Sequence, residues 1–390
     1  MSKSLLIVAP YFYPAVEFGG PVTSTLELAI AMVKRGSRVT VLTTDIRQGG
    51  RGIKTKKRDI DGVNIIYAKS LFGKLGWKIR LFISFDQIIK GIGLIKKSDI
   101  VHFQDFFVLS HFFLSIFCTI YNKKYFITPH GSFSFKQERG NVLAKKIFFY
   151  IFIKRVVDKA TKIIAVSQKE KESIRQEFPT YKGKVVYIPN IVSFKKDKGE
   201  NVRKRLKLGR YDKIVLFLGR IYQLKGVTDL LEGFVLYKKT NRKNIKLVFA
   251  GPDAGAVNHL KALINKKRIG KNVIFSGMVE ATAKSSLIKE SDVVCLTSYS
   301  EGLPTVILEA SFFSKPSIVT KECNVDSLVK AKGALITTHD PTEISKKLKI
   351  FFDSEILGSE MGKNANRWFL ENFSITKISD RYKQLYETEN

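Results

Sequence analysis

The segment Ser298-Tyr-Ser-Glu-Gly-Leu-Pro-Thr-Val-Ile-Leu-Glu-Ala310 follows a short apolar run, Val293-Val-Cys-Leu-Thr297, and carries two glutamates eight positions apart. The apolar run is typical of a buried strand, and the polar residues after it predict a turn that contains Glu301. The apolar residues that follow predict a helix that contains Glu309. A buried strand, a turn and a helix in this order are the repeating unit of a parallel α/β sheet.

Three residues between the two glutamates, Gly302, Leu303 and Thr305, lie where we expect the helix to begin. The first turn of a helix has free backbone N–H groups and the positive end of the helix dipole, which together suit a phosphate group. Eight helical residues span about 12 Å, roughly the distance from the sugar to the ribose of a nucleotide-diphosphate sugar. The spacing therefore predicts a donor site with a carboxylate at each end. Two ordinary glutamates at a helix start would give the same pattern.

A second strand-and-helix unit carries two cations. Ile214-Val-Leu-Phe-Leu-Gly-Arg220 is a short apolar run that ends in Gly-Arg, and Lys225 follows just before a helical pattern. Arg220 and Lys225 thus flank one loop at the carboxyl end of a strand, where open α/β sheets bind their ligands. Two cations there can neutralise a departing diphosphate. In so basic a chain, a solvated loop with two basic residues is the competing interpretation.

The whole chain alternates short apolar runs with helical patterns, which predicts parallel α/β sheets. The expected strands of the first half are Leu5–Ala9, Arg38–Thr43, Val63–Ala68, Ile100–Phe103, Tyr125–Thr128, Lys162–Val166 and Val185–Ile188. Those of the second half are Ile214–Leu218, Lys246–Ala250, Val273–Ser276, Val293–Thr297, Ser317–Thr320 and Ala334–Thr337. The stretch Val192–Val202 is polar and has neither pattern, so we place there a linker between an N-terminal domain, residues 1–192, and a C-terminal domain, residues 203–374.

Short motifs along nearly the whole chain resemble, in the same order, those of the retaining glycosyltransferases of family 4. The motifs are Gly19-Gly20, Pro129-His130-Gly131, Ala165-Val-Ser167, Ile188-Pro-Asn190, Leu218-Gly-Arg220 with Lys225-Gly226, Ala250-Gly-Pro252, Ser276-Gly277 and Glu301 through Glu309. Each motif alone is weak, but the ordered set is highly specific. The resemblance implies a GT-B fold, in which two Rossmann-like domains face each other across a cleft. It also implies that a last helix, within residues 375–390, returns to pack on the N-terminal domain.

The resemblance gives each candidate residue of the first half a role. Gly19 and Gly20 would let backbone N–H groups approach the phosphate of the donor. His130, which follows a predicted strand, would hydrogen-bond the donor sugar. Asp105 and Asp253 are further acids near strand ends, and we assign no role to either.

In the second half, the resemblance makes Arg220 and Lys225 the diphosphate clamp. It places Glu301 against the donor sugar and Glu309 against the ribose, where a carboxylate can accept from two adjacent hydroxyl groups. The expected reaction is sugar transfer with retention at the anomeric carbon. We find no second carboxylate to serve as a nucleophile. The resemblance implies a displacement on the same face of the sugar, in which the leaving phosphate itself takes the proton of the acceptor.

Neither a cofactor nor a metal ion is expected. The two cations and the helix start can stabilise the diphosphate without a metal, and we identify no Asp-x-Asp motif in the chain. The resemblance favours a UDP-sugar as the default donor and a glycan or a lipid-linked acceptor in a bacterial polysaccharide, lipopolysaccharide or glycolipid pathway. Because the GT-B fold hosts other activities, a nucleotide-sugar 2-epimerase and a non-catalytic nucleotide-sugar-binding protein remain alternatives.

The net charge of +32 is far from neutral for an enzyme, and residues 1–190 carry 32 Lys and Arg against 13 Asp and Glu. Basic residues alternate with aromatic ones around Trp77 and around Phe148, which suggests docking on an anionic membrane. An ordinary amphipathic surface helix, or a lysine-rich genome, would explain the same composition. Nucleic acid is not an expected partner, because no nucleic-acid-binding motif is present.

Other classes of protein fit the sequence poorly. A dinucleotide dehydrogenase needs Gly-x-Gly-x-x-Gly directly after its first strand, whereas here the glycines come late, at Gly19 and Gly20. Cys118, Cys295 and Cys323 lack the spacing of a metal site or a disulfide framework. The first predicted strand follows Met1 almost at once, so we expect no signal peptide and a cytoplasmic enzyme, peripheral on the inner face of the membrane if it docks there. The apolar stretch Phe106–Tyr121 is too short to span a bilayer and predicts a buried helix.

Overall fold

The computed structural model describes residues 3–47, 52–71, 84–133, 146–194, 201–241, 243–279, 281–354 and 356–388. The chain forms two compact units. Unit 1 comprises Met1–Ser193 together with Ser374–Asn390, and unit 2 comprises Phe194–Phe373. The division falls inside the stretch where the linker is predicted. Unit 2 begins with Phe194, because the ring of this residue packs against the rings of Phe312 and Phe369.

Unit 1 is built on one sheet, whose described strands have the order β3-β4-β2-β1-β5-β6-β7-β8. The strands are β1 (Ser4–Val8), β2 (Arg38–Thr44), β3 (Lys57–Ile60), β4 (Val63–Ala68), β5 (Ile100–Gln104), β6 (Lys124–Thr128), β7 (Lys162–Ala165) and β8 (Val185–Tyr187). All neighbours pair in parallel except β3, which is antiparallel to β4. The order reverses between β1 and β5, which makes this the switch point of the sheet.

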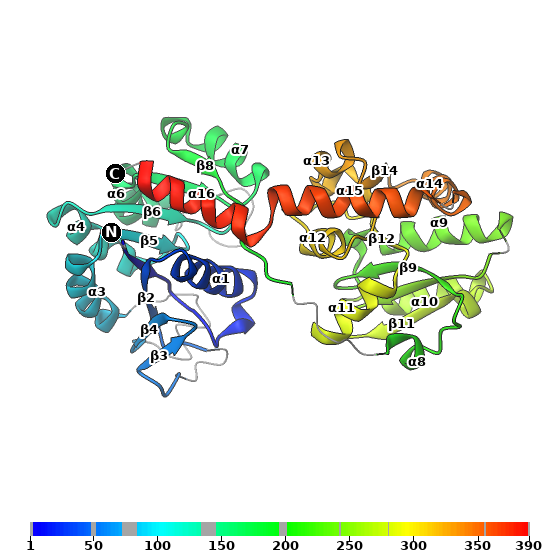
Figure 1. The fold of residues 1–390 in the computed structure, drawn as a ribbon, viewed down its shortest axis with the longest axis horizontal. Coiled ribbons are helices and arrows are strands. Elements are labelled where there is room, and N and C mark those ends of the chain that lie inside the picture. The colour runs from blue at the N-terminus through cyan, green and yellow to red at the C-terminus, as the bar shows by residue number, and fades with distance from the viewer. Residues whose placement is uncertain are drawn as a thin grey trace. The chain divides into compact units, whose positions relative to one another are not determined.

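Helices cover both faces of this sheet (Figure 1). They are α1 (Gly20–Lys34), α3 (Phe85–Lys97), α4 (Leu109–Ile120), a π-helical turn η3 (Phe149–Ile153), α6 (Lys154–Lys159), α7 (Gln168–Glu177) and α16 (Ile375–Thr388). The helix predicted from the apolar stretch 106–121 is confirmed as α4, which buries Leu114 and Cys118 in the core of the unit. Among the described residues, no helix is both long and apolar enough to cross a membrane.

The last helix, α16, packs on unit 1 as predicted, although the chain reaches it from unit 2. Arg35 at the end of α1 forms an ion pair with Asp380 at 2.6 Å and donates to the Ser379 hydroxyl. Deeper in the unit, Nδ1 of His102 on β5 lies 2.7 Å from the hydroxyl of Tyr386. A buried polar contact and a half-exposed ion pair therefore hold α16 in register on unit 1.

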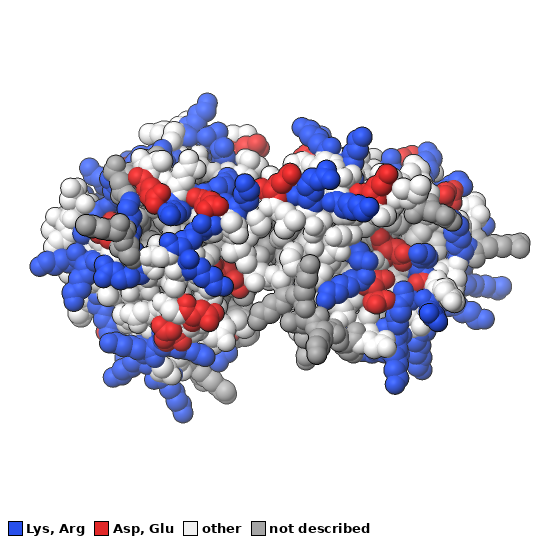
Figure 2. Space-filling view, viewed as in Figure 1, with Lys and Arg blue, Asp and Glu red and all other residues white. Residues whose placement is uncertain are grey.

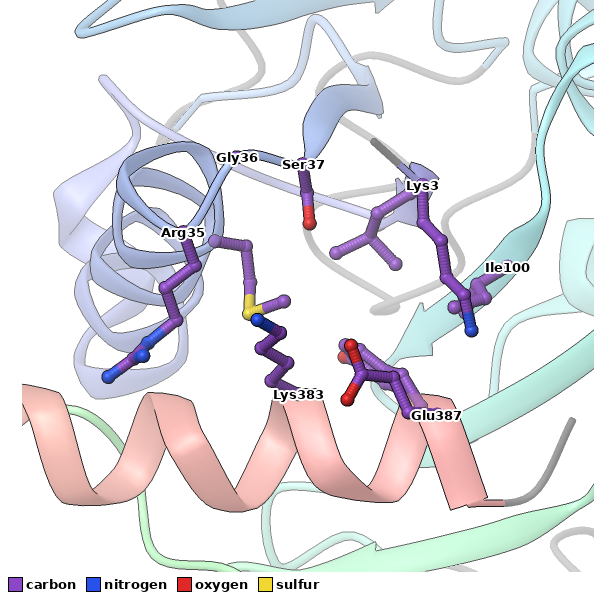
Figure 3. A pocket seen from close by; sticks show the side chains of 10 residues that line it. Lys3, Arg35, Gly36, Ser37, Ile100, Lys383 and Glu387 are labelled. Carbon is purple, nitrogen blue, oxygen red and sulfur yellow. The ribbon is translucent and has the colours of Figure 1, made fainter. Parts of the chain in front are cut away.

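A small cavity of about 100 Å³ lies beside α16, at the amino ends of β1 and β5 (Figure 3). Its lining combines apolar side chains with the charged ends of Lys3, Lys383 and Glu387. The strand-end residues singled out in the sequence follow the carboxyl ends of the same strands. The cavity thus belongs to the packing of α16 and not to the candidate site.

The described strands of unit 2 form one parallel sheet with the order β11-β10-β9-β12-β13-β14. The strands are β9 (Lys213–Leu218), β10 (Ile245–Ala250), β11 (Val273–Gly277), β12 (Val293–Leu296), β13 (Ser317–Thr320) and β14 (Ala334–Thr337). The helices are α8 (Val202–Arg205), α9 (Val227–Thr240), α10 (Val257–Lys266), α11 (Ala281–Glu290), α12 (Thr305–Phe312), α13 (Asp326–Lys330), α14 (Pro341–Asp353) and α15 (Leu357–Asn372). The order reverses between β9 and β12, so the switch point of unit 2 lies where Arg220 and Glu301 follow their strands.

Every strand predicted from the sequence is present, and each end differs from the prediction by no more than one residue. The sequence did not predict β3, whose residues Lys-Arg-Asp-Ile are mostly charged and exposed. Such a strand at the edge of a sheet has no buried face, so it lacks the apolar pattern by which strands are recognised.

We expect the buried histidines of unit 1 to make its stability depend on pH. Burial lowers the pKa of His111, on α4, from 6.5 to about 3. The unfolded chain therefore binds this proton more readily, so the stability that the neutral ring contributes is complete above about pH 6.5 and is lost as the pH falls towards 3. Each histidine of this kind costs about 1.4 kcal/mol per pH unit within that window.

In the variant His111→Leu, the free energy of unfolding should fall less steeply between about pH 6 and pH 4, by about 1.4 kcal/mol per pH unit. Urea unfolding at a series of pH values measures this slope. The exposed His259 on α10 offers the control, since His259→Gln should keep the slope of the parent chain. An unchanged slope in His111→Leu would show that this ring is not buried in its neutral form.

Candidate functional site

Two loops meet at the switch point of unit 2. One follows β9 and runs through Arg220 to the short turn Gln223–Lys225, and the other follows β12 and runs to Glu301. The backbone N–H of Tyr299 donates to the carbonyl of Leu224 at 2.9 Å, and the Ser298 hydroxyl donates to the same carbonyl at 3.1 Å. These bonds fix the second loop against the first, although the two are more than seventy residues apart in sequence.

Gly226 makes this approach possible. Its φ is +65°, in the left-handed region that favours glycine, and a Cβ atom there would lie 1.8 Å from the carbonyl oxygen of Thr297. The Thr297 hydroxyl donates to the carbonyl of Gly226 at 2.8 Å. The Lys-Gly pair seen in the sequence is therefore a steric requirement of the contact between the loops.

The contact brings Lys225 and Glu301 together. The Lys225 ammonium lies 2.6 Å from a Glu301 carboxylate oxygen, and both side chains are largely buried. The Glu301 backbone is held as well, because its N–H donates to the carbonyl of Glu322 and its carbonyl accepts from the Asn324 amide. Arg220, which precedes Lys225 in the same loop, is exposed. Its guanidinium lies 5.7 Å from the centre of the Tyr222 ring.

The helix after Glu301 begins later than predicted. The first helical residue of α12 is Thr305, with Pro304 as its N-cap, so Gly302 and Leu303 precede the helix. Proline fixes φ and has no N–H to leave unpaired, which makes it a natural residue at a helix start. The prediction that the helix begins at Gly302 and Leu303 is therefore wrong, but the N–H groups of its first turn still follow Glu301 closely.

Glu309 lies on α12 and is only 4% exposed. Its carboxylate forms an ion pair with the ammonium of Lys284, which projects from α11. Burial raises the pKa of Glu309, and the charge of Lys284 opposes this shift. Sequence reasoning missed Lys284, because a single lysine on a predicted helix gives no signal of where it points.

In unit 1, Gly19 and Gly20 lie in the loop after β1, at the start of α1. Gly19 has a φ of +87°, and a Cβ atom at either glycine would meet nothing within 4 Å. The left-handed conformation explains why Gly19 is glycine, and the open surroundings leave the backbone accessible. Both glycines thus lie where the connection that follows β1, a strand at the switch point of this sheet, enters α1.

His130 follows β6 and also has a positive φ, of +53°. Its Nε2 lies 2.8 Å from the amide oxygen of Gln104, at the end of β5, and its buried Nδ1 has no hydrogen-bond partner among the described residues. Burial lowers the pKa of His130 to about 4, with an opposing effect of the Asp105 carboxylate. The ring is therefore neutral near pH 7. With Nε2 donating to Gln104, Nδ1 is an acceptor.

Asp105 has hydrogen-bond partners that fix both its oxygens. Oδ2 accepts from the Tyr11 hydroxyl at 2.7 Å, and Oδ1 accepts from the Ser132 hydroxyl at 3.0 Å. Asp253, in contrast, accepts from the N–H groups of Gly255 and Val257 and so caps the turn before α10. Both acids lie near other candidate residues, since Asp105 acts on the pKa of His130 and Asp253 pairs through its backbone with Ile221, the residue after Arg220.

The sequence does contain one Asp-x-Asp pair, Asp59 and Asp61, which sequence reasoning overlooked. It lies in the hairpin between β3 and β4, where Asp59 accepts from the N–H of Gly62 at 3.1 Å and Asp61 has a φ of +50°. These acids form a tight turn in unit 1. No cluster of three or more potential metal ligands occurs among the described residues.

Both halves of the chain match families of known proteins. Residues 18–196 match the family described as Glycosyltransferase Family 4, and residues 199–368 match Glycosyl transferases group 1. An uncharacterised glycosyltransferase of Methanocaldococcus jannaschii is 27% identical over 277 residues, which cover 68% of each chain. The UDP-Gal:alpha-D-GlcNAc-diphosphoundecaprenol alpha-1,3-galactosyltransferase of Escherichia coli is 27% identical over 234 residues, 58% of this chain and 60% of the relative.

Among solved structures, that of Anabaena HepE in complex with UDP is similar over all of both chains, with a TM-score of 0.71 and 15% identity. WaaG, a glycosyltransferase involved in lipopolysaccharide biosynthesis, is similar over 98% of this chain and 99% of its own, with a TM-score of 0.63 and 15% identity. At such identities the likeness concerns the fold, two Rossmann-like units of the GT-B type. Since the family matches extend over both units, the chain belongs to the group 1 glycosyltransferases of the family 4 type.

Proposed function

We propose that the chain transfers a sugar, with retention, from a nucleotide-diphosphate sugar to a glycan or lipid-linked acceptor. The observation that carries this proposal is the meeting of Lys225, Glu301 and the start of α12 at the switch point of unit 2, beside the loop of Arg220. A UDP-sugar is the first donor to test. Because the Escherichia coli relative is named for a diphosphoundecaprenol acceptor, we propose an acceptor of this class, in bacterial polysaccharide or cell-envelope biosynthesis.

The residues suggest how the reaction proceeds. Arg220, Lys225 and the N–H groups at the start of α12 stabilise the diphosphate as its bond to the anomeric carbon breaks. Glu301 is a poor nucleophile, because its carboxylate is bonded to an ammonium group. The acceptor oxygen therefore attacks from the side of the leaving group, and the departing phosphate takes its proton. In unit 1, we assign Nδ1 of His130 to a sugar hydroxyl and the Gly19-Gly20 backbone to phosphate.

Two other functions of the same fold make different predictions. A 2-epimerase converts one nucleotide sugar into another without any acceptor, and a binding protein leaves the nucleotide sugar unchanged. A thermal-shift screen of UDP, GDP, ADP and their sugars selects the donor, since a ligand that binds only the native state raises the melting temperature. Release of the nucleotide diphosphate only when a diphosphoundecaprenol-linked sugar is added identifies a transferase, and the anomeric configuration of the product, read by NMR, tests retention.

Replacing Arg220 should impair transfer without unfolding the chain. We expect Arg220→Ala to lower the turnover on the order of 100-fold, since one stabilising group for the leaving diphosphate is removed. Arg210 is a matched control, because it too is exposed and lies 5.7 Å from the centre of a tyrosine ring, that of Tyr211. Arg210→Ala should keep full turnover. A folded Arg220→Ala enzyme with normal turnover would refute the clamp.

We also propose that transfer needs no divalent metal. Two cations and a helix start supply the positive charge that a metal ion would otherwise bring to the diphosphate. Turnover should therefore be unchanged after treatment with EDTA and dialysis. If EDTA abolishes turnover and manganese or magnesium restores it, the donor site depends on a metal and this part of the proposal fails.

Finally, we propose that unit 1 docks on an anionic membrane, where a lipid-linked acceptor lies. Lys and Arg side chains are spread over both units (Figure 2), so net charge alone does not single out one surface. Large exposed apolar side chains occur on both units, and one group of them lies on adjacent elements of unit 1. Six of them lie on α3, α4 and the segment 147–151, which are neighbours on one side of unit 1 (Figure 1): Phe85, Ile89, Ile120, Ile147, Tyr150 and Ile151. We call these six residues the apolar face.

The charges around the apolar face suit anionic lipid. Helix α4, in the middle, contains no charged residue, while Lys96, Lys97, Lys146 and Arg155 are exposed on the neighbouring elements. The acids there, Asp86 and Asp158, are each bonded to a lysine four residues away. An interfacial helix combines apolar side chains that enter the headgroup region with basic ones that bind anionic headgroups. The other basic-aromatic stretch, around Trp77, and Lys145 lie outside the described residues.

Liposome co-sedimentation tests this docking. Binding should require phosphatidylglycerol in phosphatidylcholine vesicles. It should weaken as the salt concentration rises from about 50 to 500 mM, because the screening length becomes shorter. Neutralising Lys146, Lys154 and Arg155 to glutamine should reduce it, since each basic side chain near the surface contributes about 1 kcal/mol. The control removes three exposed lysines of unit 2, Lys261, Lys266 and Lys267, and should bind normally. Equal recovery with neutral and anionic vesicles would contradict the proposal.

A further inference from the structure

Glu309 is a carboxylate in surroundings that oppose its charge. It is 4% exposed and is the fifth residue of α12. The favourable field of a helix N-terminus falls off within the first turn, so the helix itself stabilises this charge little. Burial accordingly raises the pKa of the Glu309 carboxyl. Without a compensating cation, a carboxyl group in such a place tends to be neutral.

Lys284 supplies the cation. It lies on α11, a helix that packs against both α12 and β9, and its ammonium contacts the Glu309 carboxylate. The side chain of Lys284 is 30% exposed and that of Glu309 is 5% exposed, so the pair lies at the edge of the interior with the lysine outermost. Among the described residues, Lys284 is the charged group that acts on the pKa of Glu309. Helix α15, on another side of α12, contributes the uncharged amide of Asn366, which donates to Ser311 and Phe312.

We propose that Lys284 is a positioning residue of the nucleoside site, which keeps Glu309 ionised and oriented so that its carboxylate accepts from the ribose hydroxyls of a nucleoside diphosphate. This inference rests on the proposed function, which assigns the ribose to Glu309. An ionised carboxylate accepts from two hydroxyl groups at once, whereas a protonated one must donate through one oxygen. The same logic applies at Glu301, where Lys225 is the compensating cation.

The ribose provides a specific readout. If Lys284 acts through Glu309, the loss of Lys284 should weaken the binding of a ribonucleotide more than the binding of the matching 2′-deoxyribonucleotide, which offers one hydroxyl group fewer. If Lys284 instead contacts the diphosphate, its loss should weaken the binding of both ligands equally. Calorimetry with UDP and 2′-deoxy-UDP distinguishes the two, and the GDP or ADP pair replaces them if the thermal-shift screen selects another base.

We expect Lys284→Met to lower the affinity for UDP about tenfold or more, which is the loss typical of a hydrogen bond to a charged group. The variant should also have a smaller preference for UDP over 2′-deoxy-UDP. The pH dependence should change as well. The parent enzyme is the reference, because there the Lys284 ammonium opposes the rise that burial causes in the pKa of Glu309. In Lys284→Met its pKa is higher, so affinity should rise with pH as the carboxyl group ionises. Lys284→Arg keeps the charge and should restore the parent behaviour.

Lys289, on the same helix, gives a matched control. It is half-buried and lies 5.0 Å from the centre of the Phe313 ring, so Lys289→Met removes one charge from α11 without affecting Glu309. Thermal melts without ligand verify that each variant is folded. Normal UDP affinity in Lys284→Met, or equal losses for UDP and 2′-deoxy-UDP, would overturn the inference.

The variant Glu309→Gln separates this inference from the function on which it rests. If it binds UDP normally, the assignment of the ribose to Glu309 is wrong. If its affinity for UDP falls while that of Lys284→Met does not, the assignment of the ribose stands and only the role of Lys284 fails. If both lose UDP, the double variant should be no weaker than Glu309→Gln alone, because the lysine acts through the glutamate.

Discussion

The candidate site depends on the close contact between the loops that follow β9 and β12. Parallel strands at a switch point send their connections in opposite directions, which opens a crevice at their carboxyl ends. In unit 2 the two connections are in direct contact, because the backbone N–H of Tyr299 donates to the carbonyl of Leu224 and only glycine fits at position 226. The distance between Lys225 and Glu301 follows from this contact. Hydrogen bonds between the two loops thus hold the site in place before a ligand binds. Stabilising a developing charge requires such preorganisation.

Charge compensation is the second constraint. Each of the two glutamates that the sequence places eight residues apart is bonded to a lysine from another element, Glu301 to Lys225 and Glu309 to Lys284. Both carboxylates are largely buried, and a buried charge without a partner would be costly enough to shift its protonation. The paired lysines allow the carboxylates to remain ionised in a part of the fold that excludes much of the water. The charges within each of these two pairs cancel, in contrast to a chain whose net charge is +32.

The fold could be read from the sequence to within a residue at the strand ends, because buried parallel strands are continuous apolar runs and helices repeat with a different period. The edge strand β3 escaped, since a charged strand with no buried face carries no such pattern. At the site, the loop residues Arg220, Lys225 and Glu301 were predictable from their places after strands. The sequence did not predict that Lys225 pairs with Glu301 or that Lys284 pairs with Glu309, because the partners of long flexible side chains are known only from the three-dimensional structure. The start of α12 was placed too early, since Gly302 and Leu303 do not exclude a helix and only the N-cap geometry of Pro304 identifies its beginning.

The pairing of Lys225 with Glu301 bears on how a donor would bind. A diphosphate and Glu301 are both anions, and Lys225 can serve either of them. A diphosphate that takes Lys225 deprives Glu301 of its cation, and the carboxylate then needs new donors, which the hydroxyl groups of the sugar can provide. Phosphate binding and sugar binding would thus be coupled through one lysine: each half of the donor makes the other half bind better, and an isolated phosphate gains less from the site. The diffuse positive charge of the surface attracts anions of every kind. A site that must exchange the ion pair of Lys225 with Glu301 for another can select, from among these anions, the one that carries a sugar.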